Sequence, residues 1–378
     1  MIQCKNQQKM ARYYSPENIQ FGGCIFGEKY KDLVGFVGHQ IYMRNVIFGN
    51  KINTPVEIKR QYVYNLFPYS YRLVYSDVIN HFFQRDWYSK GEKCYGYCWK
   101  DYSFASCRHK LIVYNDLAVV KRMKERLSKS RGSLLWWIER QLKRIKILDI
   151  NDDKLNLITN NDMDKFIHHK NVIHAINSKM WFVGRDSTGR RVHSNLSNLP
   201  RRLKPYLVVD GQRLSQIDIC NSQLLFLSKY VEDHRFRDLC EKGEIYDYIA
   251  NKGNWSRDYV KEQIIKQGLF CKSTSPYNKT PVMKRLYSEF PLVHDYLNKV
   301  KHPKRYKFLS HKLQSDESHI VIDRTCGRIK KEKPNTFVGT IHDAILCSPS
   351  DIDYICEIIM KECYEARKLI PKLKIEHY

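Results

Sequence analysis

The segment Leu214–Tyr230, LSQIDICNSQLLFLSKY, constrains the fold more than any other part of this sequence, because it carries one carboxylate from an apolar strand directly into an apolar helix. Isoleucines on either side of Asp218 are typical of a strand, and the leucine-rich run that follows is typical of a helix. The preceding Asp210-Gly211 pair predicts a hairpin turn, which places Asp218 near the end of the second hairpin strand. A carboxylate there is costly to bury unless a cation meets it, and a divalent metal ion is the usual solution.

A second acidic position lies in Thr336–Ser348, TFVGTIHDAILCS, where two apolar runs flank His342-Asp343. Almost no room remains for a loop, so the segment predicts a tight β-hairpin with Asp343 at its tip. Two aspartates brought side by side repel each other unless they share metal ions. A pair of Mg²⁺ ions about 3.5–4 Å apart is the standard device for in-line phosphoryl transfer. The two segments therefore predict a metal site built from Asp218 and Asp343.

The charge balance of the chain points to a polyanionic partner. Its 378 residues contain 65 Lys and Arg against 40 Asp and Glu, a formal net charge of +25, and its 26 tyrosines offer surfaces on which bases can stack. A basic proteome background is the alternative explanation, but it rarely produces so large an excess in one chain. The length allows a sizeable core and predicts two structural units.

No run of about 18 apolar residues is present, and the N-terminus lacks the apolar core of a signal peptide. We therefore expect a cytoplasmic protein with no membrane partner, whose 12 cysteines are mostly reduced. Four side chains at short spacing, Cys94, Cys98, Cys107 and His109, raise the alternative of a zinc site. Their C-x3-C-x8-C-x-H spacing departs from the usual ribbons and fingers, and the aromatic residues between them favour a strand.

The N-terminal part of the chain carries little recognisable chemistry. Asp116–Lys129 and Ser133–Leu148 have helical spacing, and between Asp149 and Asn171 the composition shifts to Asn, Asp, Lys and His. We take this shift as a boundary, with an N-terminal nucleic-acid-binding region over 1–165 and a second region over 166–378. A basic stretch that either follows a phosphate backbone or faces solvent is formed by Lys121, Arg122, Lys124, Arg126, Lys129 and Arg131.

Several short motifs between 188 and 378 occur in the order found in family A nucleic-acid polymerases, and this part of the chain resembles that family. Thr188–Pro200, TGRRVHSNLSNLP, is similar to the family's segment before motif A. Asp218 stands at the motif A aspartate, and His342-Asp343 stands at the His-Asp pair of motif C.

Three further matches lie between the two aspartate motifs. Glu241–Ala250, EKGEIYDYIA, resembles the Gly-acid-Ile-Tyr segment that leads toward the fingers of the family. Arg257 and Lys261 have the Arg-x3-Lys spacing of motif B, which puts both on one helix face. Gln314 matches the glutamine that contacts the minor groove of the primer-template. Each motif alone is weak evidence, and their shared order carries the resemblance.

The resemblance implies a role for each matching residue. Catalysis would involve Asp218, Asp343 and Lys261. Two Mg²⁺ ions, with Mn²⁺ as the alternative, would be held by Asp218, Ile219 and Asp343. The incoming nucleotide would contact Arg257, Lys261, Gln223 and Phe270. The nucleic acid would contact Arg190, Asn195, Asn198, Gln314 and His342.

The fold implied is α+β: a palm with an antiparallel sheet, helical fingers inserted at about 235–305, and a mainly helical N-terminal region in the place of a thumb. The expected activity is that of a monomeric DNA polymerase serving DNA replication, which extends a DNA primer-template with dNTPs. RNA and NTPs are the alternative template and substrates. Two other classes stay open, a single-subunit DNA-directed RNA polymerase and a basic nucleic-acid-binding protein without catalysis.

The sequence departs from the family at two positions. Motif B places an aromatic residue eight positions after its lysine, where this chain has Leu269, and Phe270 follows one step later. One step on a helix turns a side chain by about 100°, so Phe270 can serve only if the helix is bulged or ends early. Gln223 stands where family A DNA polymerases carry the Glu that excludes a 2′-hydroxyl, which favours the RNA polymerase alternative. Gln is nearly the same size as Glu, however, so the steric gate is expected to survive.

Overall fold

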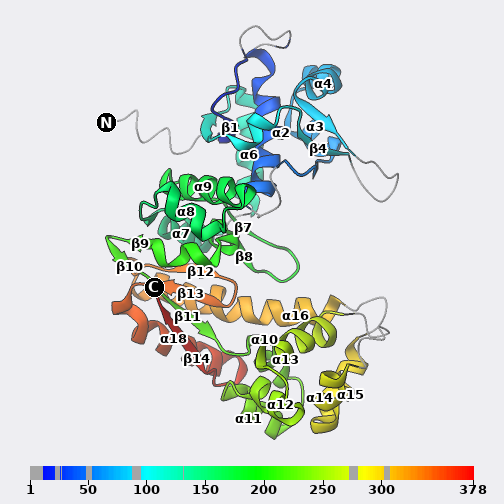
Figure 1. Cartoon of the computed structure of the whole chain (residues 1–378), viewed down its shortest axis with the longest axis vertical. Coiled ribbons are helices and arrows are strands. Elements are labelled where there is room, and N and C mark those ends of the chain that lie inside the picture. The colour runs from blue at the N-terminus through cyan, green and yellow to red at the C-terminus, as the bar shows by residue number, and fades with distance from the viewer. Residues whose placement is uncertain are drawn as a thin grey trace. The chain divides into compact units, whose positions relative to one another are not determined.

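The structure is a computed structural model that describes residues 12–21, 26, 28–47, 53–86, 95–130, 132–271, 280–301 and 307–378. Helices and short antiparallel sheets alternate along these residues, so the protein has an α+β fold (Figure 1). This fold class is the one expected from the sequence, and it is confirmed. In the part of the chain that the structure describes, no helix combines the length and the apolar character needed to cross a membrane.

The chain forms two compact units, and each is assembled from separate stretches of sequence. Unit 1 consists of Met1–Ser133, Lys146–Trp181 and Asn198–Lys204. Unit 2 consists of Leu134–Ile145, Phe182–Ser197 and Pro205–Tyr378. All the motifs that resemble a polymerase lie in unit 2, except for the short end of the segment before motif A, residues 198–200.

Unit 1 combines helices with two small sheets. Strand β1 (Arg12–Pro16) pairs with β5 (His109–Val113), and β4 (Gly96–Trp99) lies between β2 (Val56–Glu57) and β3 (Phe83–Arg85). Its helices are η1 (Glu28–Tyr30), α2 (Lys31–Tyr42), η2 (Met43–Ile47), α3 (Arg60–Leu66), α4 (Tyr69–Phe82), α5 (Tyr102–Ser106), α6 (Leu117–Ser130), α8 (Asp152–Thr159) and α9 (Met163–Asn177). In the basic stretch, Lys121 and Arg122 are described on α6, while the side chains of residues 124–131 lie outside the described part.

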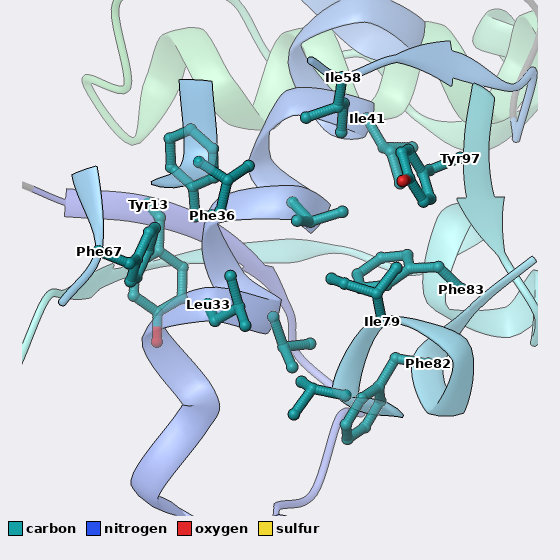
Figure 2. Close-up of a cluster of buried hydrophobic side chains, with 14 of the residues drawn as sticks. Tyr13, Leu33, Phe36, Ile41, Ile58, Phe67, Ile79, Phe82, Phe83 and Tyr97 are labelled. Atoms are coloured by element: carbon teal, nitrogen blue, oxygen red, sulfur yellow. The ribbon is translucent and has the colours of Figure 1, made fainter. Parts of the chain in front are cut away.

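A core of aromatic and aliphatic side chains holds α2, α3 and α4 against these two sheets (Figure 2). Tyr13 from β1 and Phe36 from α2 are buried in it together with Phe67, which follows α3. Gly35 of α2 makes this packing possible, because a Cβ at that position would collide with the ring of Tyr13. Full burial of one large apolar side chain contributes about 1.5–3 kcal/mol, so this cluster is a main source of stability for unit 1.

The central sheet of unit 2 has four antiparallel strands. Its order is β12 (Gly339–Ile341), β13 (Ala344–Cys347), β11 (Ser215–Ile219) and β14 (Leu373–His377). Strands β12 and β13 form a hairpin in which Ile341 pairs with Ala344, so that His342 and Asp343 alone make the turn. His342 has a left-handed backbone with φ 53°, as tight two-residue hairpin turns require. The predicted hairpin with Asp343 at its tip is confirmed.

The hairpin expected at Asp210-Gly211 is present but shorter than the sequence suggested. Val209 of β9 (Leu207–Val209) pairs with Gln212 of β10 (Gln212–Arg213), and both turn residues have positive φ, 51° and 83°. The chain then leaves this sheet, and Asp218 lies on β11, which belongs to the central sheet. The prediction that Asp218 lies on the second strand of that hairpin is therefore wrong, because β11 is buried and pairs on both sides with distant strands.

The helices of unit 2 surround the central sheet and extend from it (Figure 1). Helix α10 (Ser222–Ser228) packs against α16 (Lys307–Ser318), and α18 (Ile352–Arg367) packs against β11 and η7 (His319–Cys326). A hairpin of β7 (Val183–Arg185) and β8 (Val192–Ser194) precedes them. Between β11 and β12 lie α10 (Ser222–Ser228), α11 (His234–Glu241), α12 (Ile245–Gly253), α13 (Arg257–Gln263), η5 (Ile264–Leu269), α14 (Pro281–Glu289), α15 (Pro291–Val300), α16 (Lys307–Ser318), η7 (His319–Cys326) and α17 (Gly327–Glu332). The described residues also form α7 (Ser133–Leu142), β6 (Ile145–Ile147), η3 (Asn195–Asn198), η4 (Arg201–Tyr206), η8 (Pro349–Asp351) and α18 (Ile352–Arg367), of which α7, β6, η3 and η4 cross the sequence boundaries between the two units.

Candidate functional site

The two aspartates singled out in the sequence meet at one edge of the central sheet. Asp218 is the next-to-last residue of β11, and Asp343 immediately precedes β13. Asp218 lies directly opposite Ala344 in the antiparallel register. Because Cα atoms of paired residues are about 4.5–5.5 Å apart, Asp218 and Asp343 leave neighbouring strands at the same place. Both residues are partly exposed, so a ligand can reach this edge.

A third carboxylate, Glu317 of α16, lies beside this pair, and the sequence analysis did not foresee it. Its side chain is 0 % exposed. Oε1 accepts hydrogen bonds from Arg191 Nε at 2.8 Å and Arg191 Nη2 at 2.5 Å, and Oε2 accepts one from Gln223 Nε2 at 2.6 Å. Burial and the negative charge of Asp343 raise the pKa of Glu317 to about 7, against the lowering effect of Arg191 and Gln223.

Ser222 connects Glu317 to the aspartate pair. Its Oγ lies 2.8 Å from Asp343 Oδ2 and 3.1 Å from Glu317 Oε2. The neighbouring Gln223 is buried and donates its amide to Glu317. The first two residues of α10 are therefore both bound to the same buried carboxylate. The signal in the sequence that could have revealed Glu317 is an acid on the buried side of a helix, which requires a cationic or hydrogen-bonding partner elsewhere in the chain.

The turn before β8 is organised by Asp186. Its Oδ1 accepts the backbone N–H groups of residues 188, 189 and 190 at 2.9, 2.6 and 3.1 Å, and its Oδ2 accepts that of Arg191 at 2.9 Å. Burial alone would raise the pKa of Asp186, but hydrogen bonds from Thr188, Gly189 and His193 lower it to about 2. The ionised carboxylate thus fixes the backbone from which Arg191 reaches Glu317.

Gln314, which the resemblance assigned to nucleic-acid contact, lies against Gly189, the residue before Arg190. A Cβ added at Gly189 would be 2.7 Å from Gln314 Oε1 and 2.9 Å from Gln314 Cβ, so only a glycine permits this approach. The glycine before motif A and the glutamine before motif C therefore meet in the fold. Arg190 is exposed beside them, with its Nη2 3.5 Å from an oxygen of Asp323.

The remaining residues assigned to nucleic-acid contact differ in their surroundings. Asn195 is buried, and its Oδ1 accepts the backbone N–H of Phe182 at 2.8 Å, which supports the start of β7. Asn198 ends η3, and its side chain lies outside the described part of the chain. His342 lies in the hairpin turn beside Asp343, with its ring 5.8 Å from that of His193.

Arg257 and Lys261 both belong to α13 and are exposed one turn apart, as their spacing predicted. Arg257 Nε contacts Asp247 Oδ2 at 3.2 Å, and its guanidinium lies 5.6 Å from the ring centre of Tyr246. Burial raises the pKa of Tyr246, while Arg257 lowers it and Asp343 raises it. The charges of Arg257 and Asp343 therefore act on the same buried phenol.

The helix bulge that the sequence analysis required is present. Helix α13 continues into the π-helix η5, and π-helical turns contain an extra residue. Leu269 is 1 % exposed, whereas Phe270, which follows the π-helix, is 37 % exposed. The aromatic side chain one step later in the sequence is thus the one presented at the surface.

The acidic edge has the donor set that Mg²⁺ uses in company with a nucleotide. Asp218 and Asp343 offer carboxylates, and the buried Ile219 offers only its backbone oxygen. Among the described residues, no group of three or more His, Cys, Asp or Glu side chains is arranged to hold a metal, and this includes Cys98, Cys107 and His109. Cys94 lies outside the described residues. Mg²⁺ is commonly bound by one or two carboxylates together with waters and substrate phosphates, so the two aspartates fit this ion.

Comparisons with known proteins find solved structures that are similar to this chain. No protein-family model matches the sequence, and no curated protein matches it. The chain is similar to the POL domain of Pol1 from M. smegmatis, solved in complex with DNA primer-template and dNTP, with a TM-score of 0.43 and 14 % sequence identity. The match covers 62 % of this chain and 57 % of that one, so it spans little more than half of that structure. Because this likeness is distant, the function is inferred from the residues of the site.

Proposed function

We propose that the protein is a template-directed nucleotidyltransferase, and within that class a DNA polymerase of the family A type. The observation that carries this proposal is the meeting of Asp218 and Asp343 at one sheet edge, with the exposed Arg257 and Lys261 on a helix that follows β11 in the chain. A protein that only binds nucleic acid has no need for two juxtaposed acids, because their repulsion weakens attraction to phosphates.

In the proposed reaction, Asp218 and Asp343 would hold the cations, together with the backbone oxygen of Ile219. When bound, two Mg²⁺ ions would lower the pKa of the attacking 3′-hydroxyl and neutralise the leaving pyrophosphate. Arg257 and Lys261 stabilise the charge that develops on the triphosphate. Phe270 stacks on the incoming base.

The proposed partners are a DNA primer-template and dNTPs, with RNA and NTPs as alternatives. Arg190 and Gln314 contact the backbone and minor groove, with His342 beside the primer end. The helices within about 235–305 act as fingers, and residues 1–165 act as a thumb-like region. A single-subunit RNA polymerase is the second candidate, and the amide at Gln223 favours it.

One four-arm assay tests the proposal. The protein is incubated with Mg²⁺ and either a labelled primer-template or a primer-free template, each with dNTPs or with NTPs. Extension of the primer by dNTPs supports a DNA polymerase, and products from primer-free template with NTPs support the RNA polymerase. If the protein binds nucleic acid but forms no product in any arm, with Mg²⁺ or with Mn²⁺, then it is a nucleic-acid-binding protein without catalysis.

Replacing Gln223 by Gly should weaken discrimination against ribonucleotides. The proposed role of Gln223 is to occupy the space of a 2′-hydroxyl, and removing its bulk opens that space to NTPs. We expect the ratio of kcat/KM for dNTP and NTP to fall by at least about tenfold. Gln223→Met keeps the bulk without the amide and should retain the wild-type ratio. If both variants behave like the wild type, Gln223 is not the gate.

A further inference from the structure

Asp343 is hydrogen-bonded to a neighbouring side chain that is itself buried. It lies in a two-residue turn, where the backbone alone does not fix the direction of its carboxylate. Within the described residues, the hydrogen bond to this carboxylate comes from Ser222 Oγ, at 2.8 Å from Oδ2. Ser222 is 6 % exposed and is the first residue of α10, so its hydroxyl is held by the start of a helix that also packs against α16.

The Arg191–Glu317 ion pair holds the first two residues of α10 in place. Glu317 Oε2 contacts Ser222 at 3.1 Å and Gln223 at 2.6 Å, while Oε1 is held by Arg191. Arg191 in turn projects from the turn that Asp186 organises. These contacts lead from the β7–β8 hairpin through a fully buried carboxylate to Asp343. Because Glu317 already accepts hydrogen bonds on both oxygens, it is better suited to support Asp343 than to bind a cation itself.

We propose that Ser222 is a positioning residue that orients the Asp343 carboxylate toward a divalent cation, and that the buried Arg191–Glu317 pair anchors Ser222 for this task. Hydrogen-bond partners that hold a metal ligand in place fix its orientation and raise its affinity for the ion. The inference rests on the proposed function only in taking Asp218 and Asp343 as the cation site. It assigns roles to Ser222, Arg191 and Glu317 that the sequence motifs did not assign.

The test is a titration of the full chain with Mn²⁺ alone, followed by electron paramagnetic resonance of the free ion, so that its readout does not depend on activity. Loss of a partner that orients a metal ligand costs about 10–100-fold in affinity, and we expect Ser222→Ala to weaken Mn²⁺ binding by this factor. The double variant Arg191→Met/Glu317→Met removes both charges together, which a fold usually tolerates. It should weaken Mn²⁺ binding similarly, and adding Ser222→Ala should weaken it little further, because all three residues act on one carboxylate.

Asp316→Asn provides the matched control. Asp316 is the preceding residue of α16 and is also buried; among the described residues its hydrogen bonds come from Arg367 Nη2 at 2.7 Å and from Tyr230, and none joins it to Ser222 or Asp343. The Mn²⁺ affinity of Asp316→Asn should stay within about twofold of the wild type, because its hydrogen-bond partners differ from those of Glu317. Thermal unfolding of every variant confirms that each is folded under the conditions of the titration.

The outcomes separate this inference from the proposed function. If Asp343→Asn loses Mn²⁺ binding while Ser222→Ala binds it like the wild type, the positioning role is wrong and the cation site stands. If the Arg191→Met/Glu317→Met variant binds like the wild type, the anchor is wrong. If Asp343→Asn itself binds Mn²⁺ like the wild type, the cation site and the proposed function fail together.

Discussion

Replacing Asp343 by Asn should abolish nucleotide incorporation while leaving the binding of nucleic acid nearly intact. Asp343 lies at the tip of the β12–β13 hairpin and is partly exposed, so its carboxylate contributes little to the core. Stabilisation of a phosphoryl-transfer transition state by metal ions amounts to several kcal/mol, and 1.36 kcal/mol is a factor of ten in rate, so we expect a loss of at least about 10³-fold. The measurement is single-turnover extension of a labelled primer-template.

A neighbouring acid supplies the control for this prediction. Asp353→Asn removes the same charge from the exposed side of α18 and should extend the primer at the wild-type rate. Asp218→Asn should be as inactive as Asp343→Asn, because both carboxylates are needed for the same ions. An Asp343→Asn variant that extends the primer at the wild-type rate would be incompatible with the two-metal assignment.

The affinity for nucleic acid should fall steeply with salt. Each phosphate contacted by a lysine or arginine releases bound counterions, and a protein that contacts 6–10 phosphates loses about 10³–10⁵ in affinity between 50 and 200 mM salt. The formal net charge of +25 provides more than enough cations for such a footprint. Fluorescence anisotropy of a labelled primer-template, measured in Ca²⁺ to prevent extension, gives the slope of affinity against salt concentration.

Single substitutions can show which residues contribute to the dependence of affinity on salt concentration. Arg190 is exposed beside Gln314, and Arg190→Gln should reduce the slope by about one unit if its guanidinium contacts a phosphate. Lys242, the residue after α11, is paired with Asp238 at 2.7 Å, and Lys242→Gln should leave the slope unchanged. A slope near zero in the wild type would show that the positive charge serves some other partner.

Local patterns in the sequence were sufficient where the structure is determined by local geometry. The hairpin at His342-Asp343 follows from two apolar runs that leave no room for a longer loop. The two strands then pair in one register, in which Ile341 lies opposite Ala344. The spacing of Ile352, Ile355, Ile359 and Cys363 is typical of a helix over Ser350–Ile370, and the structure has α18 there, Ile352–Arg367. The resemblance to the family implies a closing strand over Ile370–Glu376, and β14 spans Leu373–His377. Both elements lie within a few residues of the expected bounds.

Local patterns failed where distant partners decide the structure. The helix expected over Ser133–Leu148 ends at Leu142, because Ile145–Ile147 forms strand β6. Asp218 was assigned to the wrong hairpin because β11 takes its partners from β13 and β14, far along the chain. Glu317 was missed for the same reason, since its partner Arg191 is 126 residues away in sequence and no local pattern connects them.

A template-directed nucleotidyltransferase adds the nucleotide that the template base dictates. Four primer-templates that differ only in the first unpaired template base are each incubated with one nucleotide at a time, in Mg²⁺ and with both sugars. If Asp218 and Asp343 form the centre of a template-directed nucleotidyltransferase, each template will direct addition of its complementary nucleotide, and changing the template base will change which nucleotide is added. If the added nucleotide does not depend on the template base, or if the protein binds all four primer-templates and adds nothing, then Asp218 and Asp343 do not form such a centre.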